Sequence, residues 1–176
     1  MNRQEAKTLA LEIMAEHGLV ERGVGFKWSR AKRWFGEYAW RRDRATGDLV
    51  EEWIALSGPL TDINDRATVE DTIRHEVAHA LAGTAAGHGP EWKRQCAVTG
   101  AKPSRTCSDA EPVPHRWHGV CGWCGEVAMR RHRLTRATRD NLYMHSRCAG
   151  RPRPEGRDGS RPWIHWVDMA DQVIAA

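Results

Sequence analysis

Two histidines four residues apart, with a glutamate directly after the first, constrain this chain more than any other feature. They lie in the segment His75-Glu76-Val77-Ala78-His79. On an α-helix, residues i and i+4 lie on the same face one turn apart, so both imidazoles can reach a single Zn²⁺. The apolar neighbours Ile73 and Leu81 indicate that one face of this helix is buried in a core. The segment therefore predicts a helix that carries two metal ligands.

Glu76 and a third histidine complete the pattern of a catalytic site. The Glu76 side chain can approach the open side of the metal, where it would act as general base on a water that zinc activates. His88 follows nine residues after His79, and two intervening glycines allow the chain to turn back toward the metal. We therefore predict that His75, His79 and His88 bind a catalytic Zn²⁺. The alternatives are a chance occurrence of this short pattern on a structural helix, and a surface position for His88.

A second candidate metal site lies nearer the C-terminus. Cys121 and Cys124 form one pair with two residues between them, and His145 and Cys148 form another with the same spacing. The twenty residues between the pairs suffice for a hairpin that brings them together, and four ligands with no open position are typical of a structural Zn²⁺ in a zinc ribbon. A redox-active CxxC is the first alternative, but no βαβ context surrounds it. The second replaces His145 as a ligand by one of Cys107, His115 and His118.

Basic residues are concentrated in the same region. The net charge of the chain is +4, yet nine Arg and only two acids lie between Arg116 and Arg153, so the remainder carries about −3. Arg binds phosphate in a bidentate manner, and aromatic rings stack on exposed bases. We expect nucleic-acid binding that tolerates any sequence; the alternative is a basic face that only contacts solvent. The predicted contacts are Arg130, Arg131, Arg133, Arg136, Arg139 and Trp123.

Hydrophobic periodicity and turn residues outline the rest of the chain. Residues 3–17 have helical spacing, residues 24–60 favour two or three strands, and a helix is expected to begin near Thr68 with an approximate capping box. We expect a further short helix over residues 90–98. We expect an α+β fold with a metallopeptidase domain over residues 1–110, a zinc ribbon over 111–150, and a linker with a Trp-rich tail over 151–176.

Targeting signals and membrane spans are not recognisable in the sequence. No stretch of eighteen apolar residues occurs, and the charged N-terminus lacks the apolar region of a signal peptide. We expect a cytoplasmic, nucleoid-associated protein whose five Cys are metal ligands or reduced thiols rather than disulfides.

Three segments resemble the SprT-like metallopeptidases, which include the bacterial SprT proteins and the eukaryotic protease Spartan. They are Trp53-Ile54-Ala55-Leu56-Ser57, the helix from Asp71 to Leu81, and His88-Gly89-Pro90-Glu91-Trp92-Lys93. The resemblance implies a zincin-like domain with an N-terminal helix, a small antiparallel sheet and the HExxH helix, in which Glu76 is the base. It also implies cleavage of proteins crosslinked to DNA. The ribbon differs from many members because His145 replaces one of four Cys.

The residues and the resemblance together predict a DNA-associated zinc endopeptidase with one catalytic and one structural Zn²⁺. Its partners would be a protein substrate and single-stranded or irregular DNA, without a membrane, and we expect a monomer. In zincins the substrate typically pairs with an edge strand, and residues 51–57 are the candidate strand, with Trp53, Ala55 and Ser57 as contacts. The alternatives are a non-proteolytic nucleic-acid-binding zinc protein and a peptidase for one free regulatory protein.

Overall fold

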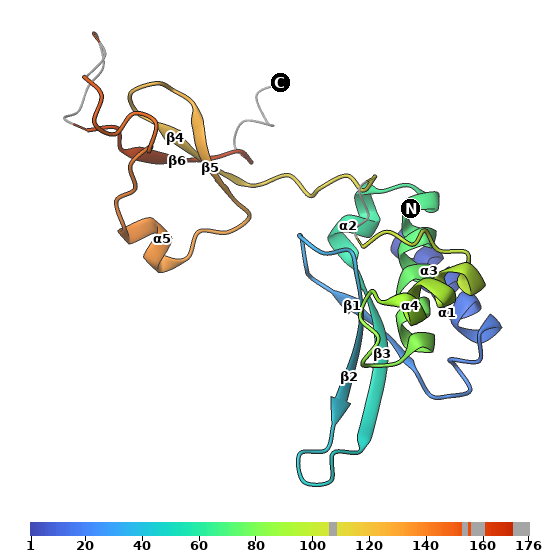
Figure 1. Cartoon of the computed structure of the whole chain (residues 1–176). Coiled ribbons are helices and arrows are strands. Elements are labelled where there is room, and N and C mark those ends of the chain that lie inside the picture. The colour runs from blue at the N-terminus through green and yellow to red at the C-terminus, as the bar shows by residue number, and fades with distance from the viewer. Residues whose placement is uncertain (106–108, 153–154, 156–160, 171–176) are drawn as a thin grey trace. The chain divides into compact units, whose positions relative to one another are not determined.

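The computed structural model describes residues 1–105, 109–152, 155 and 161–170 of the 176-residue chain. The chain divides into two compact units, Met1–Val113 and Pro114–Ala176 (Figure 1). Both contain helices together with a small three-stranded sheet, so the chain is a mixed α+β protein. Within the described residues, no helix has the length and apolar character needed to cross a membrane.

The first unit contains four helices and one three-stranded sheet. Its elements are α1 (Arg3–Glu16), β1 (Gly25–Ser29), β2 (Gly36–Arg42), β3 (Leu49–Ser57), α2 (Gly58–Ile63), α3 (Arg66–Ala82) and α4 (Pro90–Thr99). The helices α1, α3 and α4 gather on one side of the sheet (Figure 1). The core lies between them and is filled by apolar side chains of α1, α3 and β3. It includes Ile13, Met14, Ile54, Leu56, Ile73 and Val77.

The sheet of this unit has the order β1-β3-β2 and is mixed, so the expected antiparallel sheet is wrong in one strand pair. β2 and β3 form an antiparallel hairpin around the predicted turn, where Gly47 has a φ of 78°. β1 runs parallel to β3 on its other side. β1 ends, and β2 begins, at the C-terminal end of β3, and residues 30–35 connect the two strands past that end. Because β2 is antiparallel to β3, β1 is parallel to it.

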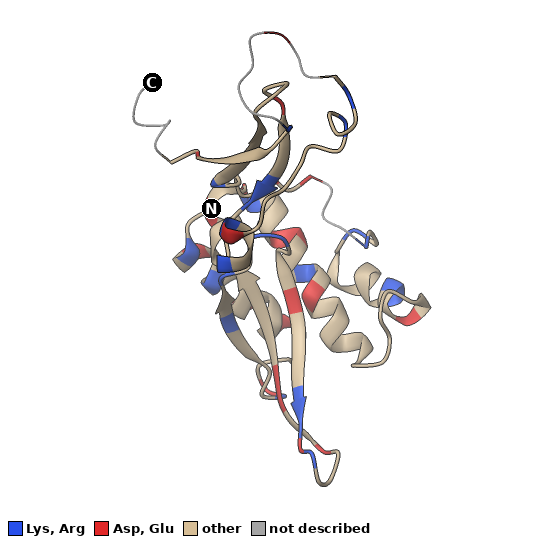
Figure 2. Cartoon of the chain, turned by 90° about the vertical axis from the view of Figure 1, so that its left-hand side faces the viewer, with Lys and Arg blue, Asp and Glu red and all other residues tan. Residues whose placement is uncertain are grey.

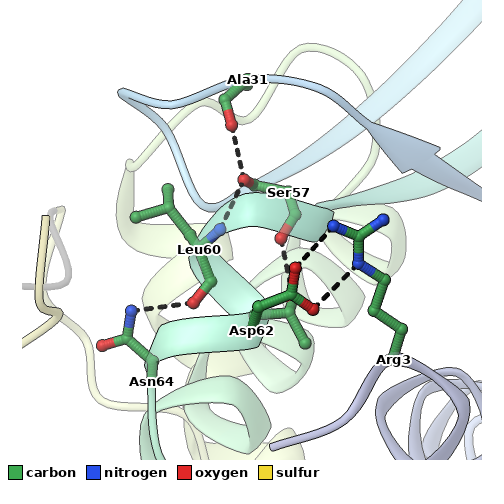
Figure 3. Close-up of polar contacts among 7 residues, drawn as sticks. Arg3, Ala31, Ser57, Leu60, Asp62 and Asn64 are labelled. Carbon is green, nitrogen blue, oxygen red and sulfur yellow. Dashed lines mark hydrogen bonds and ion pairs between the residues drawn. The ribbon is translucent and has the colours of Figure 1, made fainter. Parts of the chain in front are cut away.

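The central position of β3 contradicts the prediction that residues 51–57 are an edge strand for substrate. Trp53 and Ala55 face β1 residues on one side and β2 residues on the other, and Ser57 pairs with β1 and donates its N–H to the Phe35 carbonyl, so the main chain of β3 is already paired. The Ser57 hydroxyl is also occupied. It donates to the Ala31 carbonyl at 2.6 Å and caps α2 by accepting from the Leu60 N–H at 3.1 Å (Figure 3). The free edges of this sheet are β1 and β2.

The helix α3 begins earlier than the sequence pattern predicted. Asp65, rather than Thr68, is its N-cap, because the Asp65 carboxylate accepts from the Thr68 N–H at 2.8 Å. The helix ends at Ala82, and Gly83 supplies the positive φ of 87° that terminates it. The predicted N-terminal helix and the helix that starts at Pro90 are confirmed.

The second unit consists of β4 (Trp117–Cys121), β5 (Val127–Arg131), the short helix α5 (Arg136–Asp140) and β6 (Ile164–Asp168). β4 is central and pairs antiparallel with both β5 and β6. The C-terminal segment therefore does not form a separate tail, because β6 completes the ribbon sheet and Ile164 joins its core. The last part of the predicted Trp-rich tail, residues 171–176, lies outside the described residues.

Candidate metal centres

The first candidate centre brings together His75, His79 and His88, as the sequence predicted. The His88 Nε2 lies 3.2 Å from the His79 Nε2 and 3.3 Å from the His75 Nε2. Nitrogen ligands around a tetrahedral Zn²⁺, each about 2.0–2.1 Å from the metal, are separated by about 3.3–3.4 Å. All three atoms lie within 4.8 Å of one another. The donor set and its spacing therefore fit one zinc ion, with a fourth position left for another ligand.

Two elements and one tryptophan hold this arrangement. His75 and His79 project from the same face of α3, while the turn after Gly83 returns the chain to place His88 opposite them. The Trp92 ring of α4 contacts all three imidazoles, with ring centroids 4.9 Å from His75, 5.2 Å from His79 and 4.6 Å from His88. Trp92 is fully buried, so it supports the histidines as a rigid apolar wall.

The electrostatics of this centre favour neutral imidazoles. Burial, with the positive charge that His88 can carry as a second cause, lowers the pKa of His75 to about 4. Burial, followed by the neighbouring histidines, likewise lowers the pKa of His79 to about 4. The pKa of His88 is also lowered, by burial and by Arg105. Neutral imidazoles keep a lone pair free for a metal, so this cluster is prepared for binding at neutral pH.

Glu76 directly follows His75 on α3, is buried, and is held by the edge strand β2. Its Oε2 accepts a hydrogen bond of 2.8 Å from the Tyr38 N–H, and its Oε1 accepts none from any described residue. Burial raises the pKa of Glu76 to about 8, opposed by the Tyr38 hydrogen bond. A divalent cation at the histidines would lower that pKa again.

Gly36 of β2 leaves the space that the Glu76 carboxylate occupies. A Cβ at Gly36 would lie 2.7 Å from both the Cγ and the Oε1 of Glu76, and 2.8 Å from the Cγ2 of Thr72. Real side chains do not approach so closely, so a larger residue at position 36 would displace Glu76. The sequence offered no local signal for this contact, because Gly36 and Glu76 are distant along the chain.

A polar network behind Tyr38 was also missed by the sequence patterns. The Tyr38 hydroxyl donates to the Glu52 carboxylate, and Arg22 forms an ion pair of 3.0 Å with the same carboxylate. Arg22 also donates to the Ala80 carbonyl of α3 at 2.9 Å. Burial, followed by the hydrogen bond to Glu52, raises the pKa of Tyr38. The network ties β2 and β3 to α3, which fixes the strand that holds Glu76.

The second candidate centre brings together Cys121, Cys124, His145 and Cys148. The His145 Nδ1 lies 3.3 Å from the Cys124 Sγ and 3.4 Å from the Cys148 Sγ, and all four ligand atoms lie within 4.8 Å. Sulfur and nitrogen ligands of one tetrahedral Zn²⁺ are about 3.5 Å apart. The cluster favours His145 over the alternative ligands: His115 instead stacks on another imidazole, and Cys107 lies outside the described residues.

Surrounding groups tune this second centre. The Glu126 carboxylate lies 4.0 Å from the His145 Nε2, so it faces the nitrogen that Nδ1 ligation leaves free. Burial opposes ionisation of Cys121, but N–H groups of the Cys124 and Trp123 backbone outweigh it and lower the pKa of the thiol to about 7. Burial and the two neighbouring thiols raise the pKa of Cys148 to about 11.

The predicted nucleic-acid contacts separate into two groups. All five arginines between the metal-ligand pairs are exposed, and basic residues occur on both units (Figure 2). Among the described residues, Arg130, Arg133 and Arg139 form no ion pair, whereas Arg136 lies 3.4 Å from Asp140. Trp123 is only 6% exposed and packs in the ribbon core with Ile164. The prediction that Trp123 stacks on a base is therefore wrong, because its ring stabilises the metal knuckle from inside.

Comparisons with known proteins agree with the geometry of the first unit. The family model described as the SprT-like family matches residues 6–111, which is more than half of the chain. Searches of curated proteins and of solved structures found no match. The chain therefore belongs to the SprT-like family, and this membership indicates a zinc-dependent, peptidase-like domain in the first unit.

Proposed function

We propose that this SprT-like protein is a DNA-associated zinc endopeptidase that hydrolyses peptide bonds of DNA-bound or DNA-crosslinked proteins, with one catalytic and one structural Zn²⁺. The observation that carries the proposal is the set of three imidazole nitrogens at tetrahedral spacing, with a buried glutamate on the same helix. Three protein ligands and an open position are typical of catalytic zinc sites, whereas four closed ligands are typical of structural ones.

Glu76 would act as the general base. When bound, Zn²⁺ supplies a Lewis acid that polarises the scissile carbonyl and acidifies water. The Tyr38 N–H fixes one oxygen of Glu76, and this leaves Oε1 to take the proton of the attacking water. The same carboxyl group would then deliver that proton to the departing amine. Because Glu76 is buried, its carboxylate has a fixed orientation and little contact with bulk water. A fixed orientation favours proton transfer from a water molecule bound beside it.

The free edge of β2 would bind the substrate main chain. The Tyr38 N–H points away from β3 because it donates to Glu76, and by the period of two residues Gly36 and Trp40 also direct main-chain groups away from β3. An extended substrate that pairs with this edge would pass directly beside Glu76. β2 therefore replaces residues 51–57 as the proposed substrate strand.

The exposed arginines of the second unit would hold DNA. Arg130, Arg133 and Arg139 are exposed and free of ion pairs among the described residues, so they can neutralise phosphates without breaking an existing contact. Single-stranded or irregular DNA is the proposed partner because nothing in the described ribbon presents a long helix to a major groove. The protein would act as a monomer in the cytoplasm, at the nucleoid.

The test compares Glu76→Gln with Glu70→Gln, a matched substitution on the same helix. A DNA-binding protein crosslinked to a single-stranded oligonucleotide serves as substrate, and zinc content is measured for each variant. We expect Glu76→Gln to keep its zinc and to lose cleavage by about 10³-fold or more, because the base is removed while the ligands remain. Glu70→Gln should cleave normally.

Unchanged cleavage by Glu76→Gln would refute the mechanism. Absence of cleavage by the wild-type chain, with DNA binding intact, would favour the non-proteolytic alternative. Cleavage that ignores both DNA and salt would favour a peptidase for one free regulatory protein.

A further inference from the structure

The connection between β1 and β2 carries a second cluster of cations, on the first unit. It has the sequence Arg30-Ala31-Lys32-Arg33-Trp34, and its three basic side chains are exposed. Trp34 is 58% exposed, more than any other tryptophan of the chain. This segment, called the 30–34 loop below, combines positive charge with an accessible aromatic ring.

The 30–34 loop is anchored at both ends, so its exposed side chains have a fixed base. The Ala31 carbonyl accepts the Ser57 hydroxyl at 2.6 Å, as Figure 3 shows, and the Ala31 N–H donates to the Ser29 hydroxyl at 3.1 Å. Next to the loop, Phe35 is buried in the core and its carbonyl accepts the Ser57 N–H at 2.7 Å. Ala31 is therefore partly covered and Phe35 buried by the fold, while the cations and Trp34 remain exposed to solvent.

The cations of the 30–34 loop form no ion pairs among the described residues. Other cations of the same sheet form ion pairs, such as Lys27 and Arg41 with Glu51. Among the described residues, Arg30, Lys32 and Arg33 have no such partner. Three unpaired cations around an open indole match a chain of phosphates with unstacked bases, because cations neutralise phosphates and an indole stacks on any base. An acidic peptide would use the cations alone and would leave Trp34 without a partner.

The 30–34 loop also lies close to the catalytic glutamate. Only Phe35 separates Trp34 from Gly36, and two residues of extended chain span at most about 7 Å. Gly36 is in direct contact range of the Glu76 carboxylate, as the 2.7 Å approach of a Cβ shows. A ligand on Trp34 would therefore lie near Glu76 within a single unit, whatever the arrangement of the two units.

We propose that the 30–34 loop is a second site for single-stranded nucleic acid, located on the peptidase unit itself. Arg30, Lys32 and Arg33 contact phosphates, and Trp34 stacks on a base. Nucleic acid held here presents an attached protein to the β2 edge beside Glu76. The proposal rests on the proposed function for the identity of the partner, and it adds a binding site that is separate from the arginines of the second unit.

The test uses the full-length, zinc-loaded chain with Glu76→Gln, which prevents cleavage during binding. Affinity for a short fluorescent oligothymidylate is measured by anisotropy over a range of salt concentrations. The charge variant is Arg30→Gln/Lys32→Gln/Arg33→Gln. Its matched control removes three exposed cations elsewhere on the same unit, in Lys7→Gln/Arg66→Gln/Lys93→Gln. The aromatic variant is Trp34→Ala, with Trp34→Phe as the conservative change and Trp40→Ala, on the neighbouring strand, as control.

We expect the charge variant to weaken binding by about tenfold or more and to reduce the slope of log affinity against log salt by about 2, since each single-strand phosphate contact contributes about 0.7. The matched control should change both values much less. Trp34→Ala should weaken binding by about tenfold, with partial recovery in Trp34→Phe and little change in Trp40→Ala. Photocrosslinking to a bromouracil oligonucleotide should label the peptide that contains Trp34.

Two results would overturn this inference while leaving the proposed function intact. One is equal binding by the charge variant and its control, while Arg130→Gln/Arg133→Gln/Arg139→Gln weakens binding. The other is displacement of the oligonucleotide by polyglutamate together with no effect of Trp34→Ala, which would indicate a general anion surface. Absence of oligonucleotide binding in the intact chain would overturn both this inference and the DNA partner of the proposed function.

Discussion

The two metal-ligand clusters of this chain both have donor atoms suited to zinc, but they differ in the size of the core that surrounds them. The first has three histidines from α3 and the following turn, packed against Trp92, and the buried Glu76 follows the first of them on the helix. The second has three cysteines and His145, with the exposed Glu126 carboxylate 4.0 Å from His145 and a small core around it. The first unit also has a large apolar core, formed by its helices and sheet. From this difference we expect that a metal at the histidine cluster would take part in catalysis, whereas a metal at the cysteine-rich cluster would stabilise the fold of the second unit.

Removal of the second cluster should have the largest effect on structure. In Cys121→Ser/Cys124→Ser, we expect the second unit to unfold, because its core is small and a structural zinc site contributes about 10 kcal/mol or more to folding. The first unit should remain folded, and zinc content should fall from two ions per chain to one. Metal analysis and the dispersion of backbone amide signals in NMR spectra measure both effects. A folded second unit with two zinc ions per chain would contradict the assignment of these ligands.

A small change beside the first cluster should reduce activity without loss of metal. Gly36→Ala places a Cβ 2.7 Å from the Glu76 carboxylate, so Glu76 or β2 must shift. A misplacement of about 1 Å in a catalytic group costs about 10²-fold in rate. We expect that loss in kcat with unchanged zinc content. Gly25→Ala on β1 is the control, because its Cβ would meet ordinary contacts of 3.7 and 3.8 Å. Equal activity of the two variants would refute the close placement of Gly36 and Glu76.

The two clusters should also differ in how pH affects zinc affinity, to a smaller extent. A thiol must lose its proton to bind zinc, and Cys148, with a pKa of about 11, is protonated at neutral pH. Affinity at the second cluster should therefore fall by at least about tenfold for each unit of decrease in pH below 8, because the thiol ligands must lose protons to bind zinc.

The histidine cluster should show little pH dependence over the same range. His75 and His79 have pKa values of about 4, so protons do not compete with zinc there until the pH falls well below 6. Competition with a chromogenic chelator at several pH values, on single-cluster variants, measures each affinity. Parallel pH curves for the two clusters would contradict this difference.

Short-range patterns predicted much of both clusters. The spacing of His75 and His79 places them on one face of any α-helix, and the glycine after the helix indicated where the chain turns toward His88. The CxxC and HxxC pairs were recognisable for the same reason, since each pair lies within one tight turn. In each case the relevant geometry depends on neighbours within a few residues, which the sequence displays directly.

Long-range contacts were beyond such patterns. The alternation of β3 is the same for an edge strand and a central strand, so the sequence could not show that residues 49–57 lie between two partners. Trp123 is of a residue type that often stacks on bases, and it lies among arginines in the sequence. In the fold it is buried against Ile164, which belongs to a strand about forty residues later in the chain. The contact between Gly36 and Glu76 likewise depends on how β2 packs on α3.

The sequence alone predicted the chemistry that we propose for this protein: which imidazoles and thiols would share a metal, and which residue would act as base. It did so because ligand spacing on a helix or a turn is a local property. Only the tertiary structure decided which strand edge stays open, which tryptophan meets solvent, and what holds Glu76. Those outcomes depend on burial and pairing between segments far apart in the chain, where several arrangements satisfy the same local pattern and packing selects one.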